Sequence, residues 1–398
     1  MTYASSPIPA SPAVENVFLK MLPITSAVFV GFLTIGLALP VLPLHLHYTL
    51  DMSPLVVGIA IGSQFAAALL SRAWAGGLAD ARGGKRAVIL GLFSAALSGV
   101  AYLSSLAFIG MPVVSVGALL LGRVLLGCGE SLVITGALGW GMGLVGLRHA
   151  GKVMAWVGMA MFGAYAAGAP LGTLIYGRYD FAGIAFATII IPLLALGTVV
   201  PAAAVAVSTA KRVPFYKVLG TVWVPGLGVG LCCVGFGVVT TFIALLFAAR
   251  HWGSASLAFT SFGVAFIVAR LLFAHLPDKI GGARVALVCV LIETAGLLLI
   301  WQASGVMMAY AGAAFTGFGY SLSFPGFGVE AVRRAPPQSR GAAMGAFMAF
   351  SDMALGITGP AAGAIAGAAG VNAVYLAGAG AVLLSTFVAG YLLANKAA

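Results

Sequence analysis

Nine carboxylate side chains are spread through the 398 residues of this chain, and four of them fall inside long apolar segments: Glu130, Glu293, Glu330 and Asp352. A charge at the centre of a bilayer costs at least about 2.5–3.5 kcal/mol on insertion scales, so such residues tend to be paired or functional. Reversible protonation is the chemistry open to an isolated buried carboxyl group, because burial favours the neutral form.

Glu130 and Arg123 stand seven positions apart in one apolar segment. In a helix this spacing is nearly two turns, so both side chains face one way, about 10 Å apart along the axis. The arginine favours the ionised carboxylate, whereas a low-dielectric cavity favours the protonated one. We expect Glu130 and Arg123 to form a proton-coupled switch. The alternative is a fixed buried hydrogen bond that locks this helix.

Asp352 lies about eleven residues into its apolar segment and is the second candidate, either for protons or for a polar substrate. Its counterpart in the internal repeat described below is Phe162, so this charge belongs to one half of the chain only. We expect Glu293 to make a structural hydrogen bond. Glu330 is expected to form a local ion pair with one of the arginines that closely follow it.

The composition indicates that these carboxylates sit in a membrane. Apolar residues make up 62% of the chain and charged residues 7%, with a mean hydropathy of +1.11, whereas soluble domains carry about 25% charged residues. The apolar runs are too long and uniform for barrel strands, and a membrane-spanning helix needs roughly 20 residues. The sequence therefore predicts an all-α membrane protein with twelve transmembrane helices. The expected helices span residues 21–46, 54–78, 87–109, 113–141, 152–176, 182–207, 218–249, 255–276, 285–302, 306–330, 341–367 and 373–394.

The net charge of +11 comes from Lys and Arg in short connections between the helices. Twelve crossings put both termini on one side, and the termini and connections on that side carry fifteen basic residues. The opposite side carries Arg178 and Arg250. Basic residues favour the cytoplasmic side, so we expect a multi-pass protein of the bacterial inner membrane with both termini cytoplasmic. This distribution does not suggest a nucleic-acid partner.

No pattern in the chain indicates a cofactor or an enzyme. The four cysteines lie in apolar runs without zinc-site or C-x-x-C spacing. A phosphate-binding G-x-x-x-x-G-K-S/T motif is absent, so ATP is not expected to drive the protein. His45 and His47 are expected at the membrane interface and not in a metal pair. We expect no cofactor, no metal site and no enzymatic activity.

The chain also contains an internal repeat, because its two halves resemble one another in sequence. Arg72 precedes Asp80 by eight positions, Arg270 precedes Asp278 by eight, and these two pairs are 198 positions apart. Farther along, the offset is 190, as between Pro170 and Pro360. Parallel repeats of this kind place a binding cavity between two bundles near the bilayer midplane. The expected division is a cytoplasmic tail at 1–19, an N-terminal six-helix bundle at 20–207, a linker at 208–217 and a C-terminal six-helix bundle at 218–398.

The charged hairpin at residues 76–86 resembles the G-x-L-a-D-r-x-G-r-k signature of the major facilitator superfamily, between helices 2 and 3 as in that family. Residues 122–130 look like the family's helix 4 signature, and the full length is similar to the YhhS/YfcJ-type, arabinose-efflux-permease-like branch. The resemblance implies that both hairpins form a cytoplasmic gate that latches the halves in an outward-open state. The gate residues expected on this basis are Arg72, Gly76, Asp80, Gly83, Lys85, Arg86, Arg270, Asp278, Gly281 and Arg284.

These observations together predict a proton-coupled secondary transporter that exports a small organic molecule, sugar-like or drug-like. One alternative is proton-linked uptake of a sugar or organic acid. Another is a membrane receptor or lipid-handling protein without transport, against which the retained Glu130, Asp352 and hairpins argue. The expected partners are a small-molecule substrate, protons and the lipid bilayer, and the protein is expected to be a monomer. Residues that could line the substrate cavity are Thr34, Gln64, Trp140, Tyr165, Thr240 and Tyr320.

Overall fold

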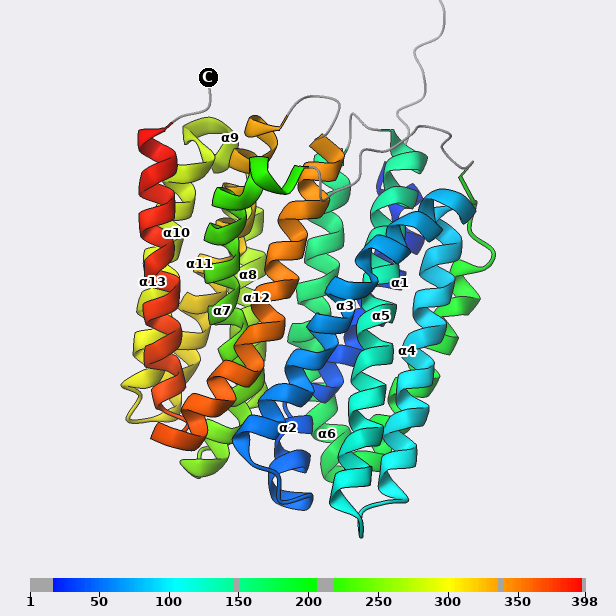
Figure 1. The fold of residues 1–398 in the computed structure, drawn as a ribbon. Helices are drawn as coiled ribbons and strands as arrows, with labels where there is room; N and C mark the ends of the chain where they lie inside the picture. The colour runs from blue at the N-terminus through cyan, green and yellow to red at the C-terminus, as the bar shows by residue number, and fades with distance from the viewer. Residues whose placement is uncertain (1–16, 147–149, 206–217, 336–339, 396–398) are drawn as a thin grey trace, which may run out of the picture.

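The computed structural model describes residues 17–146, 150–205, 218–335 and 340–395, and this part of the chain forms a bundle of helices without strands (Figure 1). The linker predicted at 208–217 lies outside the described residues, as does most of the predicted tail at 1–19. The helices are α1 (Val17–Ala38), α2 (Leu42–Leu44), the π-helical turn η1 (His45–Thr49), α3 (Pro54–Arg82), α4 (Gly84–Leu106), α5 (Pro112–Val145), α6 (Ala150–Val199), α7 (Leu219–Ala249), α8 (Ser256–Phe273), α9 (Leu276–Ile280), α10 (Gly282–Trp301), α11 (Val306–Arg334), α12 (Arg340–Ala369) and α13 (Ala373–Ala394).

The described residues contain nine helical stretches that are long and apolar enough to cross a membrane. One of them, Lys152–Val199, has 48 residues, and its backbone leaves the helical conformation at Tyr179 and Asp180. Since about 20 residues suffice for one crossing, this stretch crosses twice. α11 and α12 have 29 and 30 residues and run alongside the others (Figure 1). The twelve expected crossings are therefore present.

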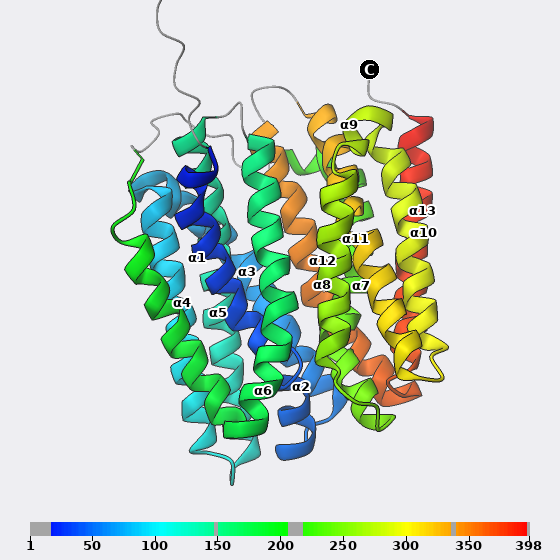
Figure 2. The ribbon, with the colours of Figure 1, turned by 180° about the vertical axis from the view of Figure 1, so that it is seen from behind.

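α1 begins and α13 ends at the same face of the bundle (Figure 1), as an even number of crossings requires. We call this the terminal face and the opposite one the distal face. α3 and α8 begin at the distal face, whereas α6 and α12 run toward it from the terminal face (Figures 1 and 2).

Two expected helices end earlier than the hydropathy suggests. The first was expected to continue to residue 46, but α1 ends at Ala38, and a short α2 and η1 follow. Pro40 lies in this break, and proline cannot donate to the carbonyl one turn before it. The helix expected to reach residue 207 ends at Val199, just before Pro201. The residue before a proline is pushed out of the helical region.

The repeat seen in the sequence has a counterpart in the packing of glycines. A Cβ atom on Gly84 would lie 2.5 Å from the carbonyl oxygen of Gly136, and one on Gly282 would collide with the carbonyl of Gly326. The first pair joins α4 to α5, and the second joins α10 to α11. The two hairpins also share a turn geometry, because Gly83 and Gly281 have φ of 89° and 98°. Glycine adopts such positive values without steric strain.

The N-terminal half (α1 to α6) and the C-terminal half (α7 to α13) meet along two helix pairs, α3 with α12 and α6 with α8 (Figures 1 and 2). Toward the distal face, α3 and α12 approach backbone to backbone. A Cβ atom on Gly58 would collide with the carbonyl group of Gly359, and one on Gly363 would lie 2.9 Å from the Cα of Leu55. Small residues at such a crossing let membrane helices approach closely.

Candidate functional site

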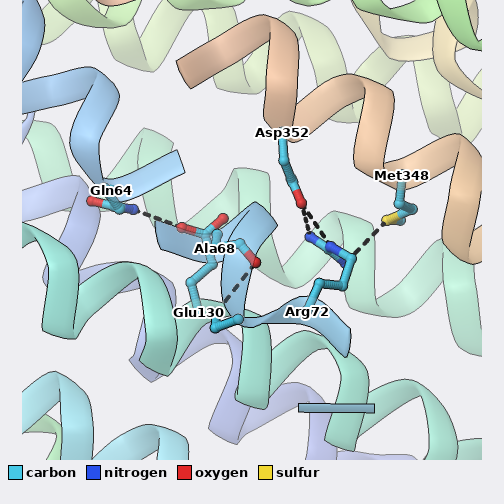
Figure 3. Close-up of polar contacts among 7 residues, drawn as sticks. Gln64, Ala68, Arg72, Glu130, Met348 and Asp352 are labelled. Carbon is cyan, nitrogen blue, oxygen red and sulfur yellow. Dashed lines mark hydrogen bonds and ion pairs between the residues drawn. The ribbon is translucent and has the colours of Figure 1, made fainter. Parts of the chain in front are cut away.

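An ion pair joins the two halves where α3 and α12 lie side by side (Figure 3). Arg72 donates from Nε to Oδ2 of Asp352 at 2.6 Å, and its Nη2 contacts the same oxygen. The side chains are 13% and 11% exposed. Met348, one turn before Asp352, places its sulfur 3.9 Å from Nη1 of Arg72. The carboxylate expected to bind protons and the arginine expected in the gate are therefore one another's partners.

The second carboxylate at the centre of the structure is that of Glu130 on α5, which is 8% exposed. Its Oε2 accepts a hydrogen bond of 2.7 Å from Nε2 of Gln64 on α3 (Figure 3). Arg123 faces α3 as well, but it donates to the backbone carbonyls of Ala60 and Ile61, each at 3.3 Å. Glu130 and Arg123 thus share a helix face, as their spacing predicts, without a hydrogen bond between them among the described contacts.

Both carboxylates are held by α3. Gln64 and Arg72 stand eight positions apart on this helix, so their backbones are about 12 Å apart along its axis. Gln64 reaches back into the N-terminal half, and Arg72 reaches across to the C-terminal half (Figure 3). The charges of Asp352, Arg72 and Arg123 all act on Glu130. The two carboxyl groups are thus connected through side chains of one helix.

Aromatic rings from both halves pack together next to these groups. Phe162 on α6 stacks on Phe266 of α8 with ring centroids 3.7 Å apart, and Tyr165 stacks on Phe236 of α7 at 5.8 Å. Phe236 in turn stacks on Tyr320 of α11 at 5.6 Å. We call this set the aromatic cluster; its members are Phe162, Tyr165, Phe236, Phe262, Phe266 and Tyr320. In this conformation the cluster packs the two halves together where α6 meets α7, α8 and α11.

The other residues expected in the cavity lie in different surroundings. The hydroxyl groups of Thr34 and Thr240 are buried and donate to carbonyl groups of their own helices, those of Gly31 at 2.6 Å and Phe236 at 2.9 Å. Trp140 lies apart from the aromatic cluster, near the terminal end of α5, where its indole donates to the carbonyl of Ala203 at 2.9 Å. Of the expected cavity residues, Gln64, Tyr165 and Tyr320 gather near Glu130 or in the aromatic cluster.

The hairpin residues make contacts mainly within their own halves. Lys85 donates to the carbonyl groups of Val200 and Ala202 at 2.7 and 2.6 Å, and so holds the end of α6. Lysine at a helix C-terminus satisfies carbonyl groups that lack a partner in the helix. Arg270 donates from Nη2 to the carbonyl of Ser321 on α11 at 2.9 Å. Asp278 lies in the first turn of the short α9.

The remaining residues expected in the gate are Gly76, Arg86, Arg284 and Asp80. Gly76 of α3 has open space around its Cα. Arg86 and Arg284 are exposed. Asp80 is half-buried near the terminal end of α3. The roles of these residues in a gate remain a prediction.

Three expectations about single residues can be compared with the structure. Glu330 pairs with Arg334 on the next turn at 2.5 Å, which confirms the local ion pair. The hydrogen bond expected for Glu293 is wrong, because neither carboxylate oxygen has a partner among the described residues. His45 lies in η1 at the distal end of the bundle, but its ring is 2% exposed and stacks on Phe181 at 4.1 Å, so its position at the membrane interface stays a prediction. The turn that follows the break at Pro40 brings this ring inward.

A shallow groove of about 520 Å³ lies on the outer side of α3 and α5. Its lining is almost entirely apolar and includes Leu70, 82% exposed, and Trp74. Neither Glu130 nor Asp352 contributes to it. In a membrane this surface faces acyl chains, so we place the site between the halves and not in this groove.

Sequence reasoning missed the partners of both carboxylates and most of the aromatic cluster. The spacings carried part of the signal, because residues three or four positions apart share a helix face. Phe162 and Tyr165 have this spacing, as do Phe262 and Phe266. No local pattern, however, indicates that Arg72 and Asp352 meet across 280 positions.

Comparison with known proteins shows which family this chain resembles in sequence. The family model "Major Facilitator Superfamily" matches residues 24–253 and 226–398. An uncharacterised MFS-type transporter of Salmonella typhimurium is 45% identical over 370 residues, covering 93% of this chain and 95% of its own length. An uncharacterised MFS-type transporter of Burkholderia mallei is 46% identical over 374 residues, covering 92% of this chain and 91% of its own.

Solved structures share the fold at low sequence identity. The crystal structure of a point mutant of the nucleoside transporter NupG superimposes with a TM-score of 0.77 at 13% identity, covering 94% of this chain and 99% of that one. The human organic anion transporter MFSD10 (TETRAN) gives 0.70 at 17% identity, covering 95% and 100%. At these identities the likeness supports the arrangement of helices alone.

Proposed function

Since the chain belongs to the Major Facilitator Superfamily, whose members are transporters and not enzymes, we propose that it is a proton-coupled secondary transporter that exports a small organic molecule by alternating access. The observation that carries this proposal is the ion pair between Arg72 and Asp352 across the two halves, next to the buried Glu130. Within the superfamily we assign the chain to the YhhS/YfcJ-type branch. We place it in the bacterial inner membrane as a monomer with both termini cytoplasmic.

The proposed coupling uses the charge of Asp352. When Asp352 takes up a proton, its attraction to Arg72 is lost, and the halves are free to separate at this level of α3 and α12. When it releases the proton, the ion pair re-forms. Protonation shifts the equilibrium between the two conformations, and the size of the shift is set by the difference in their affinities for the proton.

Glu130 supplies the second step of the proposed cycle. Its ionised form accepts a hydrogen bond from Gln64, and a proton on Glu130 changes this contact on the same helix that carries Arg72. A substrate that binds between Glu130 and the aromatic cluster competes for these groups. The cycle then exchanges bound protons for bound substrate.

The substrate can be identified by measuring the melting temperature of the protein with candidate ligands, because a ligand that binds only the folded protein raises this temperature. A panel of arabinose, benzoate and tetraphenylphosphonium samples sugar, organic acid and lipophilic cation chemistry. A molecule that raises the Tm is then added outside proteoliposomes that contain the trapped pH dye pyranine. Exchange with protons makes the lumen more alkaline, whereas uptake together with protons makes it more acidic.

The sign of the dye signal decides between the alternatives. An alkaline shift supports the exporter. An acidic shift means proton-linked uptake of a sugar or organic acid, and substrate binding without movement of protons or substrate points to a receptor or lipid-handling protein.

A further inference from the structure

Glu293 is the most deeply buried carboxyl group in the described part of the chain, and the proposed cycle does not use it. It lies in the middle of α10, inside the C-terminal half, and its side chain is 0% exposed. Neither Oε1 nor Oε2 has a hydrogen-bond partner among the described residues. An ionised carboxylate without a partner is strongly disfavoured in such surroundings. The group therefore requires a ligand that removes its charge.

The groups that face Glu293 from the neighbouring helices carry no positive charge. α13 contributes the methyl groups of Val382, and α11 contributes the backbone of Gly319. The titratable side chains close enough to interact with Glu293 are Cys232 and Cys233 from α7, Cys289 from α10 itself and Tyr320 from α11. A salt bridge within the described residues cannot neutralise Glu293.

The space around the carboxyl group of Glu293 determines which ligand can neutralise its charge. A Cβ atom on Gly235 of α7 would collide with Oε1 of Glu293, and it would lie 3.2 Å from Cδ. The carboxyl group thus lies directly on the backbone of α7, which leaves no room for a hydrated cation on that side. The described residues also contain no group of three or more His, Cys, Asp or Glu side chains that could hold a metal ion. A proton needs neither space nor additional ligands.

We propose that Glu293 is a further proton-binding site, located inside the C-terminal half and separate from Glu130 and Asp352. Cys233 connects it to the interface between the halves. The Sγ atom of Cys233 lies 3.4 Å from the hydroxyl oxygen of Tyr320, a member of the aromatic cluster. Cys233 lies close enough to both Glu293 and Asp352 for their charges to act on its thiol group. The use of this proton in transport rests on the proposed function, whereas the site itself does not.

The internal repeat shows that this carboxyl group occurs in one half only. The 198-residue offset pairs Glu293 with Ala95 of α4. The two positions have the same surroundings, because a Cβ on Gly319 would meet the backbone nitrogen of Glu293, and a Cβ on Gly129 would meet that of Ala95, at 2.6 and 3.3 Å. A small apolar residue therefore satisfies the packing here. The N-terminal half shows that the fold does not need a carboxyl group at this position.

Infrared spectroscopy of the full-length protein in lipid tests the site, because a protonated carboxyl group absorbs apart from an ionised one. At neutral pH we expect a protonated-carboxyl band that disappears in Glu293→Gln and stays in Glu130→Gln. Size-exclusion chromatography and thermal unfolding check that each variant is folded. A spectrum in which Glu293→Gln removes no protonated-carboxyl band overturns the proposal.

A second variant keeps the test decisive if Glu293→Gln does not fold. Gly235→Ala retains the carboxyl group but places a methyl group against Oε1, so it should shift the frequency of the same band. A band that Gly235→Ala leaves unmoved contradicts the assignment to Glu293. If the band behaves as expected but a pH gradient drives no transport in the wild type, the proton site stands and the proposed function fails.

Discussion

Glu130 and Asp352, one from each half of the protein, both accept hydrogen bonds from side chains of α3. Gln64 donates to Glu130 at 2.7 Å and Arg72 donates to Asp352 at 2.6 Å. The two carboxyl groups that could exchange protons are thus linked through one helix. The consequences of this link and of the packing around it can be measured in variants of the protein.

Loss of one partner of the inter-half ion pair should destabilise the protein more than loss of both. Asp352→Leu leaves the guanidinium of Arg72 without its carboxylate, and removing one partner of a buried pair costs about 3–5 kcal/mol. The double variant Arg72→Met with Asp352→Leu should regain most of the lost Tm in detergent. The control is Arg334→Met, which breaks a similarly shielded pair that is confined to a single helix and does not join the halves. Equal losses of Tm in the single and double variants would contradict the pairing.

Glu130→Gln should abolish proton coupling while keeping ligand binding. The glutamine side chain can still accept a hydrogen bond from Gln64, so the fold should be retained, but it cannot gain or lose a proton. In pyranine-loaded proteoliposomes we expect the pH signal to fall at least tenfold, while the Tm increase caused by the ligand stays. The matched control is Glu330→Gln, because Glu330 pairs locally with Arg334. A full pH signal from Glu130→Gln rules out its role in coupling.

Asp80→Asn should slow turnover and leave binding unchanged. Asp80 lies near the terminal end of α3, far from the aromatic cluster, and a weakened latch shifts a population of conformations without altering a binding site. We expect several-fold slower transport at saturating substrate with an unchanged ligand-induced rise in Tm. The outcome that argues against a latch is lost binding with normal turnover in the molecules that still bind.

Gly359→Ala should disturb the distal crossing of α3 and α12. The added methyl group would collide with the backbone of Gly58, so the two helices must move apart. Hydrogen–deuterium exchange should become faster in the distal parts of both helices. Gly367→Ala is the control on the same helix, because nothing lies within 4 Å of a Cβ atom at that position. Unchanged exchange in Gly359→Ala would mean that the crossing is looser than described.

The sequence predicted the helices well because hydrophobic length alone determines which segments cross a membrane. The break near Tyr179 and Asp180 falls between two expected helices, at a place where a polar pair interrupts apolar residues. The end of α1 was missed because the leucines and valines around Pro40 and Pro43 keep this segment apolar. The proline effect is a property of the backbone and does not appear in hydropathy.

The candidate residues could be identified because a charge inside a membrane costs free energy, but their partners could not be identified in this way. A carboxyl group in an apolar run is conspicuous, so Glu130, Glu293 and Asp352 could be found from the sequence. The choice of partner depends on how the halves dock, which no local spacing contains. Arg72 was assigned to the hairpin by its repeat mate Arg270, yet the two differ. Arg72 reaches a carboxylate on the other half, whereas Arg270 donates to a backbone carbonyl in its own.

The bare backbone contact of Gly58 with Gly359 has a kinetic consequence. Where side chains interlock, two surfaces must first disengage many rotamers before they can part, and each contributes to an activation barrier. Two helix surfaces that meet through glycine backbone have no interlocked side chains, so they can separate and re-form the contact as rigid bodies. Separation at this crossing would therefore add little to the barrier, which leaves the aromatic cluster and the ion pair of Arg72 with Asp352 as the contacts that limit how fast the halves part.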